Sequence, residues 1–446
     1  MRPEPDDGPD AGARNRRRLE AWRRSGDLRD LWPDVSAGAL REAHREIRNA
    51  TGTVLAAGFG GGPEGVGPGG PGPLPLAEVA GGGDGGRALG VAAFTSGMGP
   101  LLGRWIEEGT VDASGEVRGL FARHLDHGRR RSALLRGELV RIVGAMRSRG
   151  VDPVVLKGLH TGAAFFPEPG TRPAADIDLL VHPGERPRAA EALAAAGFTE
   201  GRRTSFARRS EWVPAGASRP VRSLELDHAD NPWSVDLHTG LERWYFRGLR
   251  RDLGGPSSGS SDRFAVEGAS LWGLGQPRLT AFLALHASYE LVKVQLVRLV
   301  ELVLVVRRDM ERRRLRWDDF AALVDRTGTG RFVQPALALA EEVAPGTVDG
   351  GLLQELGRGA TERTRRVLDA VRAADLAPLL RRSMDAKLMW ARGPRELLLN
   401  LSELILPSDD GLPVGLGRLQ WSRLVALARG AAGWRAGAGV RHPGRP

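Results

Sequence analysis

The stretch PAADIDLLVHPGE, residues 173–185, constrains the fold of this chain more than any other. Its run of Ile, Leu and Val predicts a buried β-strand bounded by proline- and glycine-containing turns. Because side chains alternate between the two faces of a strand, Asp176 and Asp178 project from one face and Ile177 and Leu179 from the other. Two neighbouring carboxylates repel each other, so this strand needs a cation nearby if both are to stay charged.

Composition excludes several classes of site. The 446 residues contain no cysteine, which rules out disulfides, thiolate metal sites and a cysteine nucleophile. The sequence shows no membrane span and no secretory signal, so we expect a cytoplasmic protein without a membrane partner. The formal net charge is +10 and comes almost entirely from arginine. Phosphate or nucleic-acid partners would suit that charge, but a composition rich in Ala, Gly and Arg throughout is the simpler explanation.

Periodicity and glycine content predict an α+β protein with a small mixed β-sheet core between helical flanks. The core is expected at residues 151–250. Around it we expect an Arg-rich helix and a Gly/Pro-rich flexible segment at 1–92, a helical lead-in at 93–150, a helical subdomain packed on the core at 265–345, a C-terminal helical region at 346–436 and a disordered tail at 437–446.

Within the core, short apolar segments alternate with helical ones. VDPVVLKG predicts a buried strand ending on Gly158, and LHTGAAFF predicts a helix directly after it. A glycine at such a turn lets backbone N–H groups approach a phosphate, and Lys157 adds a positive charge beside it. ERPRAAEALAAAGF predicts a helix that Gly197 closes, and SVDLHTGL predicts a later strand carrying Asp236 and His238.

A third aspartate on a separate strand turns the Asp-x-Asp pair into a possible metal site. Mg²⁺ prefers hard oxygen ligands and commonly joins carboxylates to substrate phosphates. We therefore predict Asp176, Asp178 and Asp236 as ligands of Mg²⁺ or Mn²⁺. His238 could orient Asp236, or could be a histidine packed at a strand end.

The order VVLKG, RPAADIDLLV, AAEALAAAGF, SVDLHTGL resembles the uncharacterised bacterial nucleotidyltransferase family of the DNA polymerase β-type nucleotidyltransferase superfamily. The resemblance runs from about residue 98 to residue 328, and more weakly to ILPSDD. It implies a nucleotidyltransferase core in which Gly158 belongs to the nucleotide-phosphate turn and Asp176, Asp178 and Asp236 form the catalytic, metal-binding triad.

The resemblance also implies an activity. A nucleoside monophosphate would pass from an NTP, with ATP as the expected one, to an acceptor hydroxyl with release of pyrophosphate; Asp236 would take the acceptor's proton. Lys157 and Arg172 are candidates for the triphosphate, although either could be a solvated charge. The acceptor could be a small molecule, a peptide or a protein.

Two departures from the superfamily pattern leave the activity open. Leu159 follows Gly158 where a serine is usual, and the spacing from Gly158 to Asp176 is longer than usual. The alternatives are an inactive relative that binds nucleotide as a sensor or scaffold, and a basic nucleic-acid-binding protein.

Other polar groups suggest weaker sites. His228, Asp236 and His238 could form a zinc site, but no fourth ligand is evident. His286 and Glu290 share a helix face, which favours a buried pair over a contact with the active site. Two further carboxylates, Glu225 and Asp227, repeat the Asp-x-Asp spacing on what reads as a solvated edge strand.

Overall fold

The computed structural model of this chain describes residues 35–58, 83–204, 208–216, 231–246, 249–255, 261–377 and 384–405, together with the pair 74–75 and short pieces between 17 and 32. Most of the expected flexible segment, the strand expected around Glu225, Asp227 and His228, and the expected tail lie outside these residues. Among the residues described, no helix is long and apolar enough to cross a membrane.

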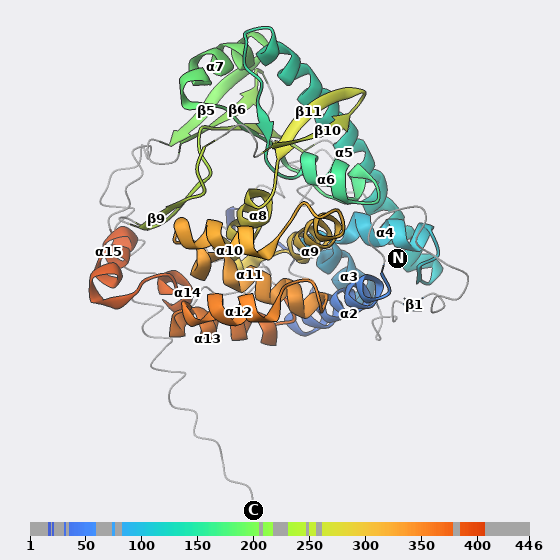
Figure 1. The fold of residues 1–446 in the computed structure, drawn as a ribbon. Helices are drawn as coiled ribbons and strands as arrows, with labels where there is room; N and C mark the ends of the chain where they lie inside the picture. The colour runs from blue at the N-terminus through green and yellow to red at the C-terminus, as the bar shows by residue number, and fades with distance from the viewer. Residues whose placement is uncertain are drawn as a thin grey trace, which may run out of the picture.

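Seven strands of the described chain form one mixed sheet, drawn at the top of Figure 1. The central strands β4 and β7 run parallel, as do β3 and β11, and the other neighbours are antiparallel. In spatial order the strands are β10 (Ser261–Val266), β11 (Ala269–Leu274), β3 (Val154–Val155), β4 (Asp176–Leu180), β7 (Ser234–His238), β6 (Arg209–Pro214) and β5 (Phe198–Thr204). This sheet with its flanking helices confirms the predicted α+β class.

The sheet extends further along the chain than the expected core of residues 151–250. β10 and β11 form a hairpin whose two turn residues, Glu267 and Gly268, both have positive φ. Such a turn matches the twist of antiparallel strands. Residues 265–274, expected to begin the helical subdomain, therefore belong largely to the sheet, and the helices of that region start at Arg278.

One face of the sheet packs on two helices. Ile177 and Leu179 of β4, with Val235 and Leu237 of β7, join a buried apolar cluster that also contains residues of α5 (Gly115–Arg147) and α7 (Arg186–Ala195). Gly197, with φ of 85°, follows α7 as predicted. Because these residues occupy one face, the alternating side chains of Asp178 and Asp236 point to the other face.

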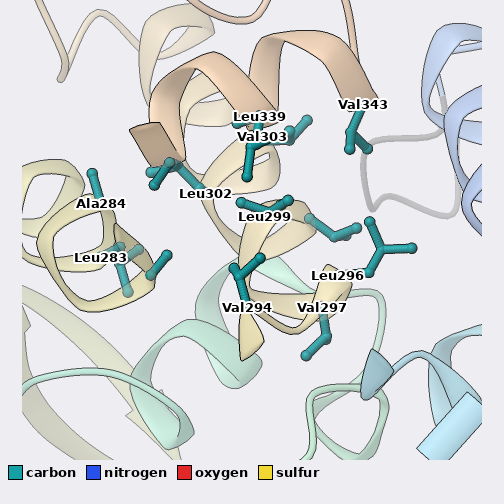
Figure 2. Close-up of a cluster of buried hydrophobic side chains, with 14 of the residues drawn as sticks. Leu283, Ala284, Val294, Leu296, Val297, Leu299, Leu302, Val303, Leu339 and Val343 are labelled. Atoms are coloured by element: carbon teal, nitrogen blue, oxygen red, sulfur yellow. The ribbon is translucent and has the colours of Figure 1, made fainter. Parts of the chain in front are cut away.

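The other face turns toward a larger helical core, in the lower half of Figure 1. Figure 2 shows its centre, where aliphatic side chains of α9 meet those of α8 and α11. The helices that follow the sheet are α8 (Arg278–Tyr289), η4 (Leu291–Lys293), α9 (Leu296–Glu311), α10 (Trp317–Arg326), α11 (Gly330–Val343), α12 (Gly350–Arg358), α13 (Glu362–Ala373), α14 (Met384–Leu388) and α15 (Gly393–Ile405).

The N-terminal part contributes ordered helices to the same core. α2 (Ala37–Ala56) and α3 (Gly83–Ser96) pack against each other, and both bury apolar residues. Gly83–Ser96 overlaps the end of the segment expected to be flexible, which is thus helical there. The remaining elements are β1 (Leu74–Pro75), α4 (Gly99–Glu107), β2 (Val111–Asp112), α6 (Leu159–Phe165), η2 (Pro169–Thr171), η3 (Pro183–Glu185) and the hairpin of β8 (Glu242–Phe246) and β9 (Leu249–Asp252).

Candidate active site

Two of the predicted metal ligands stand directly opposite each other. The parallel register of β4 and β7 pairs Asp178 with Asp236. Both side chains are buried, and adjacent strands of a sheet lie about 4.8 Å apart. A fold that buries two facing carboxylates must stabilise their charges by another group.

Lys157 supplies part of that stabilisation. It follows β3, the other neighbour of β4, and its Nζ lies 2.5 Å from Asp178 Oδ2 and 3.8 Å from Asp176 Oδ2. Asp176 is half-buried, one step earlier on the same face. The structure thus brings together the predicted residues Lys157, Asp176, Asp178 and Asp236, with the ammonium group between two of the carboxylates.

His238 contacts Asp178, and not Asp236, the carboxylate that one of its two proposed roles would have it orient. Its Nε2 lies 3.2 Å from Asp178 Oδ1. The register places His238 opposite Leu180, two residues after Asp178 and on the same face of the sheet. Burial lowers the pKa of His238 more than the carboxylate raises it, so the ring is neutral near pH 7. An ionised carboxylate only accepts hydrogen bonds, so Nε2–H donates to Asp178 and Nδ1 keeps its lone pair.

Asp178 and Asp236 differ in protonation. Burial would raise the pKa of Asp178, but the Lys157 ammonium and the His238 hydrogen bond outweigh it and hold that pKa well below its usual range. Burial and the charge of Asp178 raise the pKa of Asp236 to about 7, although Arg209, 3.3 Å away, opposes the shift. Asp178 is therefore ionised near neutral pH, whereas Asp236 is protonated in about half of the molecules.

The donor set fits a divalent cation. Ligand atoms of Asp178, Asp236 and His238 all lie within 4.8 Å of one another. Asp236 Oδ1 is buried and has no hydrogen-bond partner, which a folded protein rarely leaves without a reason. Because Nε2–H of His238 donates to Asp178, the two carboxylates are the ligands that this arrangement offers directly, and oxygen ligands suit Mg²⁺ and Mn²⁺. Asp176 stands next to this cluster and is not part of it.

Gly158 forms the expected turn between strand and helix. It has φ of 61° and immediately precedes α6. Leu159, which directly follows this turn, buries its side chain in the apolar cluster beneath the sheet. This position therefore offers a phosphate only backbone groups, since the side chain packs away from the carboxylate face.

Arg172 is neither solvated nor free. Its Nη2 lies 2.8 Å from Oε2 of Glu301, a buried carboxylate of α9, and Nη1 donates to the carbonyl of Pro173. Glu301 also accepts a hydrogen bond from Thr161 of α6. The ion pair thus ties the loop before Asp176 and the helix after Gly158 to the helical half of the molecule. A triphosphate that used Arg172 would have to compete with Glu301.

Several residues near the carboxylates were not anticipated from the sequence. Arg209 pairs with Asp236, and Glu301 with Arg172. His286 and Glu290 do not pair with each other: Arg243 donates to His286 Nδ1, and Arg298 binds Glu290 at 2.6 Å. The only sequence signal for Glu301 was a lone acid in an apolar helix. The proposed zinc ligand His228 lies outside the described residues.

One of the three comparisons with known proteins found a match. A family model described as an uncharacterised nucleotidyltransferase matches residues 88–345, more than half of the chain. The match spans the whole seven-stranded sheet and helices α4 to α11. No curated protein and no solved structure matches the chain. The chain belongs to this uncharacterised nucleotidyltransferase family.

Proposed function

We propose that the protein transfers a nucleoside monophosphate from an NTP, with ATP as the expected donor, to an acceptor hydroxyl and releases pyrophosphate. The observation that carries this proposal is the facing pair Asp178 and Asp236, with the unpartnered Asp236 Oδ1 beside a neutral His238. Facing carboxylates on adjacent strands can supply oxygen ligands to the metal ions that phosphoryl-type transfer uses.

Asp178 and Asp236 would hold Mg²⁺ or Mn²⁺, with Asp176 completing the triad. When bound, the cation neutralises negative charge on the reacting phosphate. His238 fixes the orientation of Asp178 through its Nε2–H. In the metal-free protein the pKa of Asp236 is raised to about 7. A bound cation would favour the ionised form of Asp236, which is the form that can take the proton from the acceptor hydroxyl.

Lys157 and Gly158 remain the proposed nucleotide-binding residues, whereas Arg172, a candidate from the sequence, is now proposed as a positioning residue. Lys157 contacts Asp178 and could therefore pair with a phosphate bound beside that carboxylate. Gly158 offers its backbone at the turn. Arg172 acts through Glu301 by holding the loop that leads into β4. The acceptor remains a small molecule, a peptide or a protein.

A nucleotide-binding relative without transferase activity is the second candidate. It is favoured by the contact of Lys157 with Asp178, which provides a built-in cation where an enzyme would use a metal ion. Burial of Leu159 points the same way, because the usual serine hydroxyl is missing at the phosphate turn.

Transfer of label from α-phosphate-labelled NTPs to candidate acceptors tests the proposal. We expect metal-dependent incorporation that Asp176→Asn/Asp178→Asn abolishes. The matched control is Asp262→Asn, the same change on the distant edge strand β10, where the carboxylate is half exposed. Metal-dependent NTP binding without transfer to any acceptor supports the second candidate. Absence of any NTP effect on thermal unfolding, with metal present, contradicts both.

A further inference from the structure

Arg243 differs from the other arginines around the carboxylates. Arg172, Arg209 and Arg298 each have a carboxylate within 4 Å, whereas no described carboxylate lies that close to Arg243. Its Nη2 donates to His286 Nδ1, its guanidinium lies 5.5 Å from the ring centre of Tyr289, and its buried Nε has no partner.

An arginine in this environment is costly. A guanidinium does not lose its proton under any ordinary condition, so the charge persists after its water has been removed. The imidazole of His286 accepts the hydrogen bond and is therefore neutral at that nitrogen, so it supplies no negative charge. Arg243 is partly buried and its Nε is shielded from water. A cation there without a counter-ion is unfavourable unless an anion completes it.

The position of Arg243 indicates where that anion would lie. β8 begins four residues after His238, so the chain passes from the carboxylate strand almost directly to Arg243. Burial lowers the pKa of Arg243 and the charge of Asp178 opposes this. His286 lies near Arg298, Arg243, Lys157 and Arg172, whose charges add to burial in lowering its pKa. Positive groups from β8, from α9 and from the segments after β3 and before β4 thus lie near His286, and one of them, Lys157, contacts the carboxylates.

We propose that Arg243 is the binding residue for an oxyanion of the phosphate type, held next to the carboxylates between β8 and α8. This inference rests on the proposed function for its preferred source, the terminal phosphates of the NTP, which leave as pyrophosphate. An anionic group on the acceptor is the second source with the same chemistry. The planar guanidinium would use Nε and an Nη atom to grip two oxygens at once, which an ammonium group cannot do.

The test measures binding of inorganic pyrophosphate to the full chain by calorimetry, in EDTA, so that the result does not depend on the metal site. Arg243→Gln removes the charge and keeps a donor for His286 Nδ1. We expect it to weaken binding about 10- to 100-fold, the usual effect of one charge-assisted contact. Arg243→Lys keeps the charge but not the planar pair of donors, so its affinity for pyrophosphate should lie between those of the wild type and Arg243→Gln. Arg263→Gln, which removes a cation stacked on Trp272 of the distant hairpin, should bind like the wild type.

Thermal unfolding separates binding from a structural role. Removing a partly buried cation that has no counter-ion should leave the free protein as stable as before or more stable, while the stabilisation by pyrophosphate is lost. If Arg243→Gln binds pyrophosphate like the wild type, or if the wild type does not bind it, the inference is wrong. The inference is also wrong if Arg243→Gln is unfolded in the absence of pyrophosphate while Arg243→Lys binds pyrophosphate like the wild type. In that case Arg243 has a structural role.

Titrations with Mg²⁺ and nucleotides identify the source of the anion. If Arg243→Gln binds both pyrophosphate and ATP more weakly than the wild type does, and binds AMP equally well, the site holds the terminal phosphates. If pyrophosphate binding weakens and ATP binding is unaffected, the site serves an anionic acceptor. Failure of the wild type to bind ATP with Mg²⁺ contradicts the proposed function alone, because the comparison in EDTA still decides the role of Arg243.

Discussion

The ammonium group of Lys157 and the carboxylate of Asp178 are in contact, with Nζ 2.5 Å from Oδ2, and both side chains are almost inaccessible to water. The pKa of Lys157 stays above its ordinary value although burial lowers it, because Asp176 and Asp178 raise it further. A divalent cation bound to Asp178 would have to share or displace this contact. The pair therefore links the stability of the metal-free protein to its affinity for metal.

Replacing Lys157 with glutamine should expose that link. Without the ammonium group, Asp178 is left as a buried charge with only His238 as a partner, which typically costs about 3 kcal/mol or more. Divalent metal should then recover much of the loss, so the metal-induced rise in Tm should be larger than in the wild type. Calorimetric unfolding in EDTA measures the loss of stability, and the same experiment with Mn²⁺ measures the metal-induced rise in Tm. Lys293→Gln, which changes an exposed lysine, is the control. An equal metal-induced shift in both variants would show that Lys157 does not oppose metal binding.

Asp178 and Asp236 should respond in opposite directions to the change to asparagine. Asp236 carries an unpartnered oxygen, and its charge is disfavoured by burial and by Asp178, so Asp236→Asn should leave the metal-free protein as stable as before or more stable. Asp178→Asn breaks the contacts of Lys157 and His238 and should destabilise it by several kcal/mol. Urea unfolding in EDTA measures the difference. Both changes should abolish label transfer, and equal destabilisation would contradict the unequal roles assigned here.

Sequence reasoning located the carboxylate platform because local rules determine it. Strand alternation places Asp176 and Asp178 on one face, and Ile177 and Leu179 lie in the opposite cluster as predicted. The third aspartate, Asp236, was found from its own apolar strand. The direct pairing of Asp178 with Asp236 could not be read from the chain, because it depends on β4 and β7 being parallel neighbours across nearly 60 intervening residues.

The residues that sequence reasoning missed act through contacts between distant elements. Arg172 and Glu301 are separated by 129 positions, and nothing in either local pattern predicts their pairing. Arg243 is one arginine among many in the sequence, and its place beside His286 and Tyr289, with no described carboxylate within 4 Å, becomes visible only in the folded chain. The β10–β11 hairpin has a local signal in the alternating residues around Glu267 and Gly268. The strong helical pattern that follows it led us to begin the expected helical subdomain at residue 265, inside the hairpin.

The ion pair of Arg172 and Glu301 should couple the helical half to the site. Glu301→Gln leaves the Arg172 guanidinium buried without a counter-ion and should cost about 3 kcal/mol. Arg172→Met should cost a similar amount, while the double variant should lose much less than the sum. Urea unfolding of the four proteins gives the coupling energy. The exposed pair Arg372 and Glu342 provides the control, for which little coupling is expected.

The same four proteins test whether this pair positions the site. If Arg172 holds the loop before Asp176, the single variants should lower the rate of label transfer at saturating NTP more than they raise the KM for NTP. A rise in KM with an unchanged rate would instead place Arg172 directly on the nucleotide.

Stability should fall in mild acid, in part because of His44. This residue is buried in α2 with Nε2 2.9 Å from Thr95 Oγ1, and burial lowers its pKa from 6.5 to about 4, although the charge of Asp375 opposes the shift. A histidine with a depressed pKa stabilises the fold above pH 6.5, and this contribution is lost as pH falls from 6.5 toward 4, since the unfolded chain takes up the proton first. The full loss is about 3 kcal/mol.

His44→Gln isolates this contribution because glutamine can keep the hydrogen bond to Thr95 without titrating. We expect urea-unfolding free energies measured at pH 7.5, 6.0 and 4.5 to fall less steeply in this variant than in the wild type, with the difference confined to the interval below pH 6.5. His160, also buried with a pKa of about 4, should add a second contribution of the same sign. Parallel pH profiles for the wild type and His44→Gln would show that His44 does not stay neutral in the folded core.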